Sequence, residues 1–311
     1  MVDTFTHVTL AQRVRFGRGL VAEHLTEEVD RLGSRRVLVV SSGREERAVP
    51  DLLDGIPVAL RWPEVRQHVP ADLAERARVA AREVGADVVV AIGGGSAVGL
   101  AKAVALTDGI PVVAVPTTYA GSESTDVWGL TEGGVKVTGA DPVVLPVAVV
   151  YDPALTDTMP MALAVASGLN ALAHCVDALW APRADPVNGA FALEGARRLA
   201  AGLRAVVAGG ADDGRDEALL GAHLAAVAFA SAGSALHHKV CHVLGGSFDL
   251  PHAATHAVVL PHVLALNAPA VPGPAARLAD ALGAPAAVAP GPASAVAALE
   301  ALRSDLGART A

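Results

Sequence analysis

Short apolar runs alternate with helical spacing in the first half of the chain. The stretch DLAERARVAAREVG has apolar residues at helical spacing and ends at Gly85. It lies between β-branched runs, and four such runs predict buried strands: 37–41 (VLVVS), 87–92 (DVVVAI), 111–117 (PVVAVPT) and 147–152 (VAVVYD). Nearly uninterrupted apolar strands joined by helices are typical of a parallel sheet that is covered on both faces. We therefore predict an α/β fold for this half.

The pattern changes after Asp152, where strand-like runs give way to long segments rich in Ala and Leu. Helical spacing predicts an all-helical second half, with helices over 161–180, 186–207, 215–242 and 254–267 and a looser helix-and-turn region over 268–293. A length of 311 residues fits two domains. We place the boundary at DPAL, which divides the chain into 1–152 and 153–311.

Charge and composition exclude several functional classes. A net charge of −8 without clusters of Lys and Arg argues against nucleic acid, whose phosphates require a basic face. The longest weakly charged run, ALLGAHLAAVAFASAGSALHH, contains Gly, Ser and His and predicts a buried helix, not a membrane span. Cys175 and Cys241 form no disulfide framework, and the N-terminus lacks the apolar core of a signal peptide. We therefore expect a cytoplasmic protein with a small-molecule ligand.

A glycine turn joins one predicted strand to a helix. In VVVAIGGGSAVGLAKAVAL, the residues Gly93, Gly94, Gly95 and Ser96 follow the strand and precede the helix. Glycines there let backbone N–H groups approach a phosphate, and the helix N-terminus adds roughly half a positive charge. We expect a pyrophosphate at this turn. A tight turn without a ligand explains the same residues, and the G-x-G-x-x-G fingerprint is absent.

Hydroxyl side chains follow the next predicted strand. Thr117, Thr118 and Ser122 lie at its carboxyl end, where ligands of open α/β sheets bind, although turn formation and helix capping explain such residues too. At the end of the first strand, Ser41 and Arg44 stand where an acidic residue would hold the ribose 2′-hydroxyl of NAD. Because Arg44 would accept a 2′-phosphate, NADH and NADPH both stay open as cofactors.

Histidines concentrate in residues 234–262, which hold six of the eleven in the chain. His238 and His242 are four residues apart in a helical segment, as are Asn170 and His174 in an earlier one, so each pair shares a helix face. Together with His252 they could surround a divalent metal, but the neutral amide of Asn170 is a poor ligand for Fe²⁺ or Zn²⁺. We interpret them as an acid–base and substrate-orienting cluster without metal. The remaining histidines of this stretch are expected to be supporting or core residues: His237, His256 and His262.

These motifs, with RVRFGRG, VLPVAVVYDPALT and SGLNALAHCVDALWAP, resemble the iron-containing alcohol dehydrogenase superfamily and, within it, the metal-independent maleylacetate reductases. The resemblance covers about residues 5–267. It implies the dehydroquinate synthase-like fold, with a dinucleotide-binding domain over 1–152 and a helical catalytic domain over 153–311. It also implies hydride transfer from NADH or NADPH to maleylacetate or a related unsaturated oxo acid, giving 3-oxoadipate in the degradation of aromatic compounds. The Ala-rich apolar surface permits a homodimer.

The resemblance also implies roles for individual residues. In metal-dependent members the ligands are an aspartate and three histidines, which correspond here to Asn170, His174, His238 and His252, with His242 as the catalytic-type histidine. Without metal, the expected catalytic residues are His242, His238, His252 and His174, and the expected substrate-binding residues are Asn170, Tyr119 and Lys136.

The sequence departs from the family pattern in two respects. Ala140 and Val147 replace basic residues, which would weaken binding of a dicarboxylate by roughly 2 kcal/mol if those residues served a carboxylate. The chain also ends at Ala311, earlier than family members do. A non-redox enzyme on the same fold, using the histidines for cyclisation, elimination or isomerisation, is therefore the alternative. A non-catalytic scaffold is disfavoured, since it needs neither the glycine turn nor the histidines.

Overall fold

The computed structural model describes residues 4–43, 49, 51–248, 250–284 and 291–308. The chain forms two compact units. The α/β unit comprises residues 11–118 and 122–158, as far as they are described. The helical unit comprises residues 4–10, 119–121 and the described part of 159–311. The first residues and a short piece of the loop at 119–121 therefore belong with the helices, a division that differs from a single boundary at residue 152.

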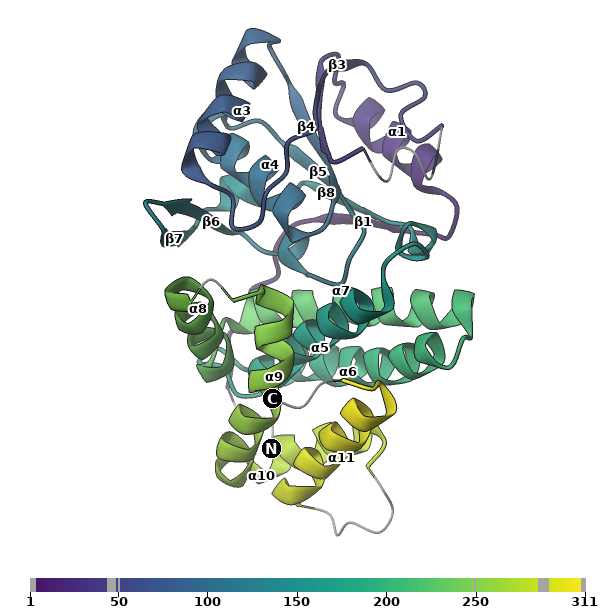
Figure 1. The fold of residues 1–311 in the computed structure, drawn as a ribbon, viewed down its shortest axis with the longest axis vertical. Coiled ribbons are helices and arrows are strands. Elements are labelled where there is room, and N and C mark those ends of the chain that lie inside the picture. Colours follow the sequence, from purple (N-terminus) through teal and green to yellow (C-terminus); the bar gives the residue numbers. More distant parts are fainter. Residues whose placement is uncertain (1–3, 44–48, 50, 249, 285–290, 309–311) are drawn as a thin grey trace. The chain divides into compact units, whose positions relative to one another are not determined.

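The α/β unit is built on a six-stranded parallel sheet in the order β1-β8-β5-β4-β2-β3 (Figure 1). Its strands are β1 (Arg13–Phe16), β2 (Val37–Ser41), β3 (Val58–Trp62), β4 (Val88–Gly93), β5 (Val112–Pro116) and β8 (Ala148–Tyr151). The four strands predicted from apolar runs form the middle of the sheet and are buried throughout. The pattern did not predict β1 and β3, because these edge strands are short and partly exposed.

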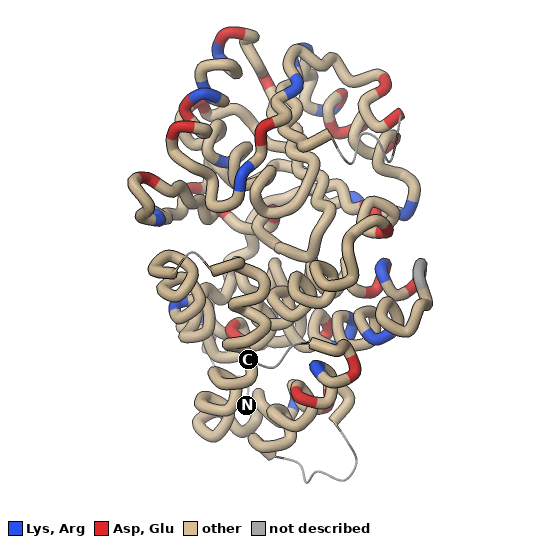
Figure 2. The backbone as a smooth tube through the Cα atoms, viewed as in Figure 1, with Lys and Arg blue, Asp and Glu red and all other residues tan. Residues whose placement is uncertain are grey.

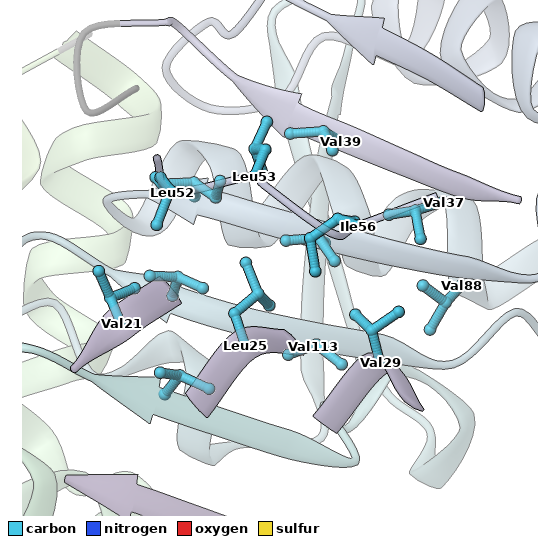
Figure 3. Close-up of a cluster of buried hydrophobic side chains, with 14 of the residues drawn as sticks. Val21, Leu25, Val29, Val37, Val39, Leu52, Leu53, Ile56, Val88 and Val113 are labelled. Carbon is cyan, nitrogen blue, oxygen red and sulfur yellow. The ribbon is translucent and has the colours of Figure 1, made fainter. Parts of the chain in front are cut away.

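Helices cover both faces of this sheet (Figure 1). Helix α1 (Val21–Arg31) covers one face, and α3 (Ala71–Glu83) and α4 (Gly95–Asp108) cover the other. Figure 3 shows Val21, Leu25 and Val29 of α1 directed at alternate strand residues such as Val37 and Val113. Burial of such side chains contributes about 1.5–3 kcal/mol each and fixes the strands whose carboxyl ends carry the glycine turn.

A β-hairpin extends the α/β unit over residues to which the sequence pattern assigned no strand. Strands β6 (Val127–Glu132) and β7 (Val135–Ala140) pair antiparallel around Gly133 and Gly134. Both glycines have positive φ, 56° and 79°, as the two-residue type I′ turn requires.

The helical unit contains α5 (Met161–Ala178), α6 (Pro186–Val207), α7 (Ala211–Ala232), α8 (Leu236–Phe248), α9 (His252–Asn267), α10 (Pro272–Leu282) and α11 (Pro292–Asp305) (Figure 1). Helix α5 is central, since α6, α7, α8 and α9 all contact it. By length and composition α5 could cross a membrane, and the bent pair of α7 and α8 passes the same test as one span. However, 78% of the apolar stretch of α5 is buried, as in a core helix.

The predicted single helical segment over 215–242 is wrong. Helix α7 ends at Ala232, α8 begins at Leu236, and the two helices bend by 98° at the break. Gly233 lies in this break with φ of 85°, a conformation that glycine adopts without steric cost. The break gives the histidine pair of the second segment its own short helix, α8. Part of the helix-and-turn region predicted over 268–293, residues 285–290, lies outside the described residues.

Candidate functional site

The glycine turn lies at the carboxyl end of β4 and leads directly into α4. Gly93 has φ of 146°, and a Cβ on Gly94 would lie 3.1 Å from the side chain of Thr118. Both positions therefore favour glycine. The first turn of α4 contains no acidic residue, which leaves its positive end available to an anion.

The predicted hydroxyl residues lie at the same edge of the sheet. Thr117 follows β5, and its N–H donates to the carbonyl of Gly93 at 3.1 Å. Ser41 ends β2, the other neighbour of β4, and its Oγ accepts from the Gly43 N–H at 3.0 Å. Because the chain leaves β2 toward β3 and leaves β4 toward β5, the strand order reverses between β2 and β4. Such a switch point is where open α/β sheets bind nucleotides. Arg44 lies outside the described residues.

Lys102 fixes the loop after β5, a role that the sequence analysis missed. The Nζ of this buried lysine donates to the carbonyls of Ser122, Thr125 and Val127 at 2.6–2.9 Å and to the Thr125 hydroxyl at 3.1 Å. Burial lowers the pKa of Lys102 to about 7 and the buried Glu123 carboxyl opposes this shift. Four oxygen acceptors stabilise the ammonium form of Lys102 against this effect of burial. The sequence signal for this role was the presence of a lysine within the otherwise apolar run of α4.

Lys136 and the two positions at which the resemblance led us to expect basic residues, Ala140 and Val147, lie on different elements of the α/β unit. Lys136 is half-buried on β7, pairs in register with Thr131, and has a pKa lowered by burial. Ala140 ends the same strand and is exposed. Val147 precedes β8 at the amino end of the sheet, where its N–H donates to the Val112 carbonyl. A basic residue at Val147 would therefore lie at the edge opposite the glycine turn.

In the helical unit, α5 presents Asn170, His174 and Asp177, which are buried and follow the i, i+4, i+7 spacing of one helix face. The segment 119–121 lies against this helix, because the Tyr119 N–H donates to Ser167 Oγ at 3.1 Å. Gly121 approaches His174 so closely that a Cβ would lie 3.2 Å from the imidazole. Tyr119 itself is fully buried.

Asp177 connects α5 to α8. Its Oδ2 accepts from the backbone N–H groups of Ala235 and His238, at 3.0 and 3.2 Å, and from the Nδ1 of His238 at 2.7 Å. The carboxylate thus satisfies the N-terminus of α8 and orients its first functional histidine. With the proton on Nδ1, the Nε2 of His238 carries a lone pair. The acidic residue three positions after His174 was the sequence signal for this contact, and it was not used.

The histidines form one continuous cluster. His174 stacks on His238 with ring centroids 4.9 Å apart, and His238 lies 4.8 Å from His256 of α9. His252 lies 4.3 Å from His256 and 6.2 Å from His242. Phe229 of α7 contacts both buried rings, His174 and His238. The structure therefore brings together all four histidines predicted to be catalytic.

Burial sets the protonation of this cluster. Burial is the largest cause that lowers the pKa of His174 and His238 well below the usual value, and the neighbouring histidines lower it further. Both are therefore neutral at pH 7. His242 and His252 are exposed, so they reach solvent. Helix α9 carries no charged residue and α8 carries only Lys239, so both helices are almost uniformly tan in Figure 2.

The expected supporting histidines differ in their environment. His237 and His256 are fully buried, as a core role requires. His262 on α9 is exposed, so the expectation of a core position is wrong for this residue. Position 262 follows Pro261 inside the helix, and α9 is apolar on nearly all sides, so hydropathy alone did not distinguish its faces.

The four positions that correspond to metal ligands do not fit a metal ion here. Asn170 contributes a neutral amide, and Asp177 on the same helix face already accepts three hydrogen bonds. Within the described part of the chain, His174, His238 and His252 do not form a group of converging ligand atoms. Three buried polar atoms of this region, Asn170 Oδ1, His174 Nδ1 and His238 Nε2, lack a hydrogen-bond partner in the described structure.

Comparison with known proteins gives consistent matches over both units. The family model described as iron-containing alcohol dehydrogenase matches residues 11–153, and that of the C-terminal region of the Fe-containing alcohol dehydrogenase family matches residues 164–311. The maleylacetate reductase of Burkholderia cepacia is 46% identical over 286 residues, which cover 91% of this chain and 81% of that protein.

Solved structures show the same architecture. An iron-containing alcohol dehydrogenase from Corynebacterium glutamicum superimposes with a TM-score of 0.92 at 51% identity, covering 98% of this chain and 84% of that one. A maleylacetate reductase from Agrobacterium tumefaciens gives 0.91 at 40% identity, covering 99% and 86%. The predicted fold, a parallel α/β domain followed by a helical domain, is confirmed.

Proposed function

Because the chain belongs to the iron-containing alcohol dehydrogenase family, we propose that it is a metal-independent NAD(P)H-dependent reductase of maleylacetate or a related unsaturated oxo acid in aromatic degradation. The similarity to maleylacetate reductases over about nine tenths of the chain supports this substrate. The observation that carries the metal-independent part is the face of α5, where the amide of Asn170 accompanies His174 in place of a carboxylate.

The α/β unit would hold the cofactor at its glycine turn. Backbone N–H groups at Gly94, Gly95 and Ser96 would cradle the pyrophosphate, because the first turn of α4 carries no competing carboxylate. When bound, the nicotinamide supplies a hydride. NADH and NADPH share the pyrophosphate that this turn would bind, and Arg44, the residue expected to distinguish them, lies outside the described residues.

The helical unit would supply the proton. Hydride addition to one alkene carbon leaves negative charge on the rest of the conjugated system, and a proton at the adjacent carbon completes the saturated bond of 3-oxoadipate. We assign proton donation to His242, which is exposed and lies one helical turn after His238. Its exposure lets it regain a proton from solvent. His252, whose ring lies parallel to that of His242 within 27°, would orient it.

The buried polar atoms would bind the substrate oxygens. An unpartnered buried donor or acceptor costs about 1–3 kcal/mol, so Asn170, His174 and His238 are better satisfied when a ligand is present. The role of Lys136 as a cation that binds a substrate carboxylate stays a prediction. The role of Tyr119 as a substrate contact, the homodimer and the cytoplasmic location stay predictions.

Cofactor titration tests the redox part of the proposal. Chelator-treated protein is titrated with NADH and with NADPH, following quenching of the fluorescence of Trp62, Trp128 and Trp180. We expect micromolar binding of one cofactor. Incubation with maleylacetate should then yield 3-oxoadipate. Failure to bind either cofactor contradicts a reductase, and conversion of the substrate without oxidation of the cofactor would favour the non-redox alternative.

A further inference from the structure

We propose that His237, Cys241 and His256 form a binding site for a soft divalent cation such as Zn²⁺, separate from the positions at which metal-dependent family members bind metal. One ligand atom from each residue lies within 4.8 Å of the others. All three side chains are buried, with exposed fractions of 0%, 1% and 0%. This inference is independent of the proposed reductase activity.

Two of the three distances between the ligand atoms are close to those around a tetrahedral ion. His237 Nε2 and His256 Nδ1 are 3.0 Å apart, and His237 Nε2 and Cys241 Sγ are 3.6 Å apart. With metal–nitrogen bonds of about 2.0–2.1 Å and a metal–sulfur bond of about 2.3 Å, tetrahedral angles give separations of about 3.4 Å and about 3.6 Å. The histidine pair would need to open by only about 0.4 Å.

Hydrogen bonds cannot satisfy all three of these ligand atoms at the same time. The Nε2 of His237 is near both His256 Nδ1 and Cys241 Sγ. A neutral imidazole nitrogen has either one proton or one lone pair, so it makes one good hydrogen bond. A cation instead accepts a lone pair from each of the three atoms at the same time.

The donor chemistry also suits the ion. Two imidazoles and a thiolate are ligands that Zn²⁺ prefers, and the thiolate supplies the negative charge that Asn170 cannot. Burial raises the pKa of Cys241 to about 12, so the ion would displace the thiol proton as it binds. Three protein ligands leave a fourth position for water or another group.

Occupancy would connect α8 to α9. His237 and Cys241 lie one turn apart on α8, and His256 lies on α9. The bound ion would therefore restrain the two helices that carry His242 and His252. Because it binds the folded chain, it should raise the melting temperature.

Cobalt provides a test that does not depend on enzymatic activity. Chelator-treated full-length protein is titrated with Co²⁺ while the near-ultraviolet absorption band from thiolate-to-cobalt charge transfer is followed. We expect a band that saturates at one equivalent, is abolished in Cys241→Ser, and is retained in Cys175→Ser, the other buried free thiol. His256→Gln should weaken binding by about tenfold or more.

Several results would overturn the site. A wild-type protein that binds Co²⁺ without the thiolate band would place the ion elsewhere, for instance at His174 and His238. A thiolate band that persists in Cys241→Ser, or a wild-type protein that binds no Co²⁺, would also contradict the proposed site. If Cys241→Ser does not fold, the wild-type band and its weakening in His256→Gln decide the question.

Discussion

The Nδ1 of His238 donates a hydrogen bond to Oδ2 of Asp177 at 2.7 Å, and both side chains are buried. The same carboxylate oxygen accepts two backbone N–H groups at the start of α8. Asp177 therefore controls both the direction of α8 and the tautomer of His238. Since His242 follows one turn later on this helix, the contact positions the proposed proton donor as well.

Replacing this carboxylate tests its positioning role. We expect Asp177→Asn to lower kcat by about 10- to 100-fold, because the amide can present an N–H to Nδ1 and so favour the opposite tautomer of His238. Cofactor affinity should stay unchanged, since the glycine turn belongs to the other unit. Asp280→Asn, an equal charge change at an exposed position of α10, serves as the control. Wild-type kcat in Asp177→Asn, measured in steady-state assays, would refute the role.

Removing the proposed proton donor gives a larger effect. His242→Ala should lower kcat by about 100- to 10,000-fold, the range for loss of a general acid, while cofactor binding by fluorescence stays intact. The matched control is His262→Ala, which removes an exposed histidine from α9 and should leave kcat unchanged. Equal rates in the two variants would exclude His242 as the donor.

A negative charge at the start of α4 should compete with the pyrophosphate. We expect Ser96→Asp to raise the cofactor Kd about tenfold or more, corresponding to roughly 1–2 kcal/mol of repulsion, without loss of thermal stability. Thr107→Asp introduces the same charge at an exposed position near the other end of the helix and should have little effect. If both variants bind the cofactor like the wild type, the glycine turn is not the phosphate site.

Stability should fall steeply in mild acid. Burial lowers the pKa of five histidines of the helical unit, with that of His223 and His237 lowered to about 4. The other three are His174, His238 and His256. Below about pH 6.5 the unfolded chain binds protons that the folded chain does not, so stability is present above this pH and is lost as pH falls toward 4.

Between about pH 6.5 and 4, each fully buried histidine should change the free energy of unfolding by up to about 1.4 kcal/mol per pH unit. Urea unfolding of the full-length protein at about pH 7.5 and about pH 5 measures this pH dependence of the free energy of unfolding. His223→Gln removes one titrating group and should flatten the slope. A midpoint that does not change over this range would show that the buried histidines protonate in the folded state.

Apolar runs were sufficient to predict the buried strands but not the edges of the sheet. The four central strands are apolar on both faces, which gives a continuous signal, whereas RVRF at β1 and VALRW at β3 mix charged and apolar residues because only part of each strand is covered. The sequence signal for the hairpin of β6 and β7 was the pair Gly133 and Gly134, which forms its turn. The amino-acid composition of this segment does not reveal that signal.

Within the site, helical spacing correctly grouped Asn170 with His174 and His238 with His242. Helical spacing also placed Asp177 on the face of His174, but it did not identify the partner of this carboxylate, because His238 is 61 positions away and lies beyond the break at Gly233. Lys102 was missed for a related reason, since its carbonyl partners lie on a loop that spacing within α4 does not reveal.

The most direct test of the account is the rate of NADH or NADPH oxidation with maleylacetate by protein from which metal has been removed by a chelator. We predict full turnover to 3-oxoadipate, with no increase when Fe²⁺ is restored. Loss of the rate on chelation and its recovery with Fe²⁺ would contradict the account, since Asn170 and the histidines would then serve a metal-dependent reaction.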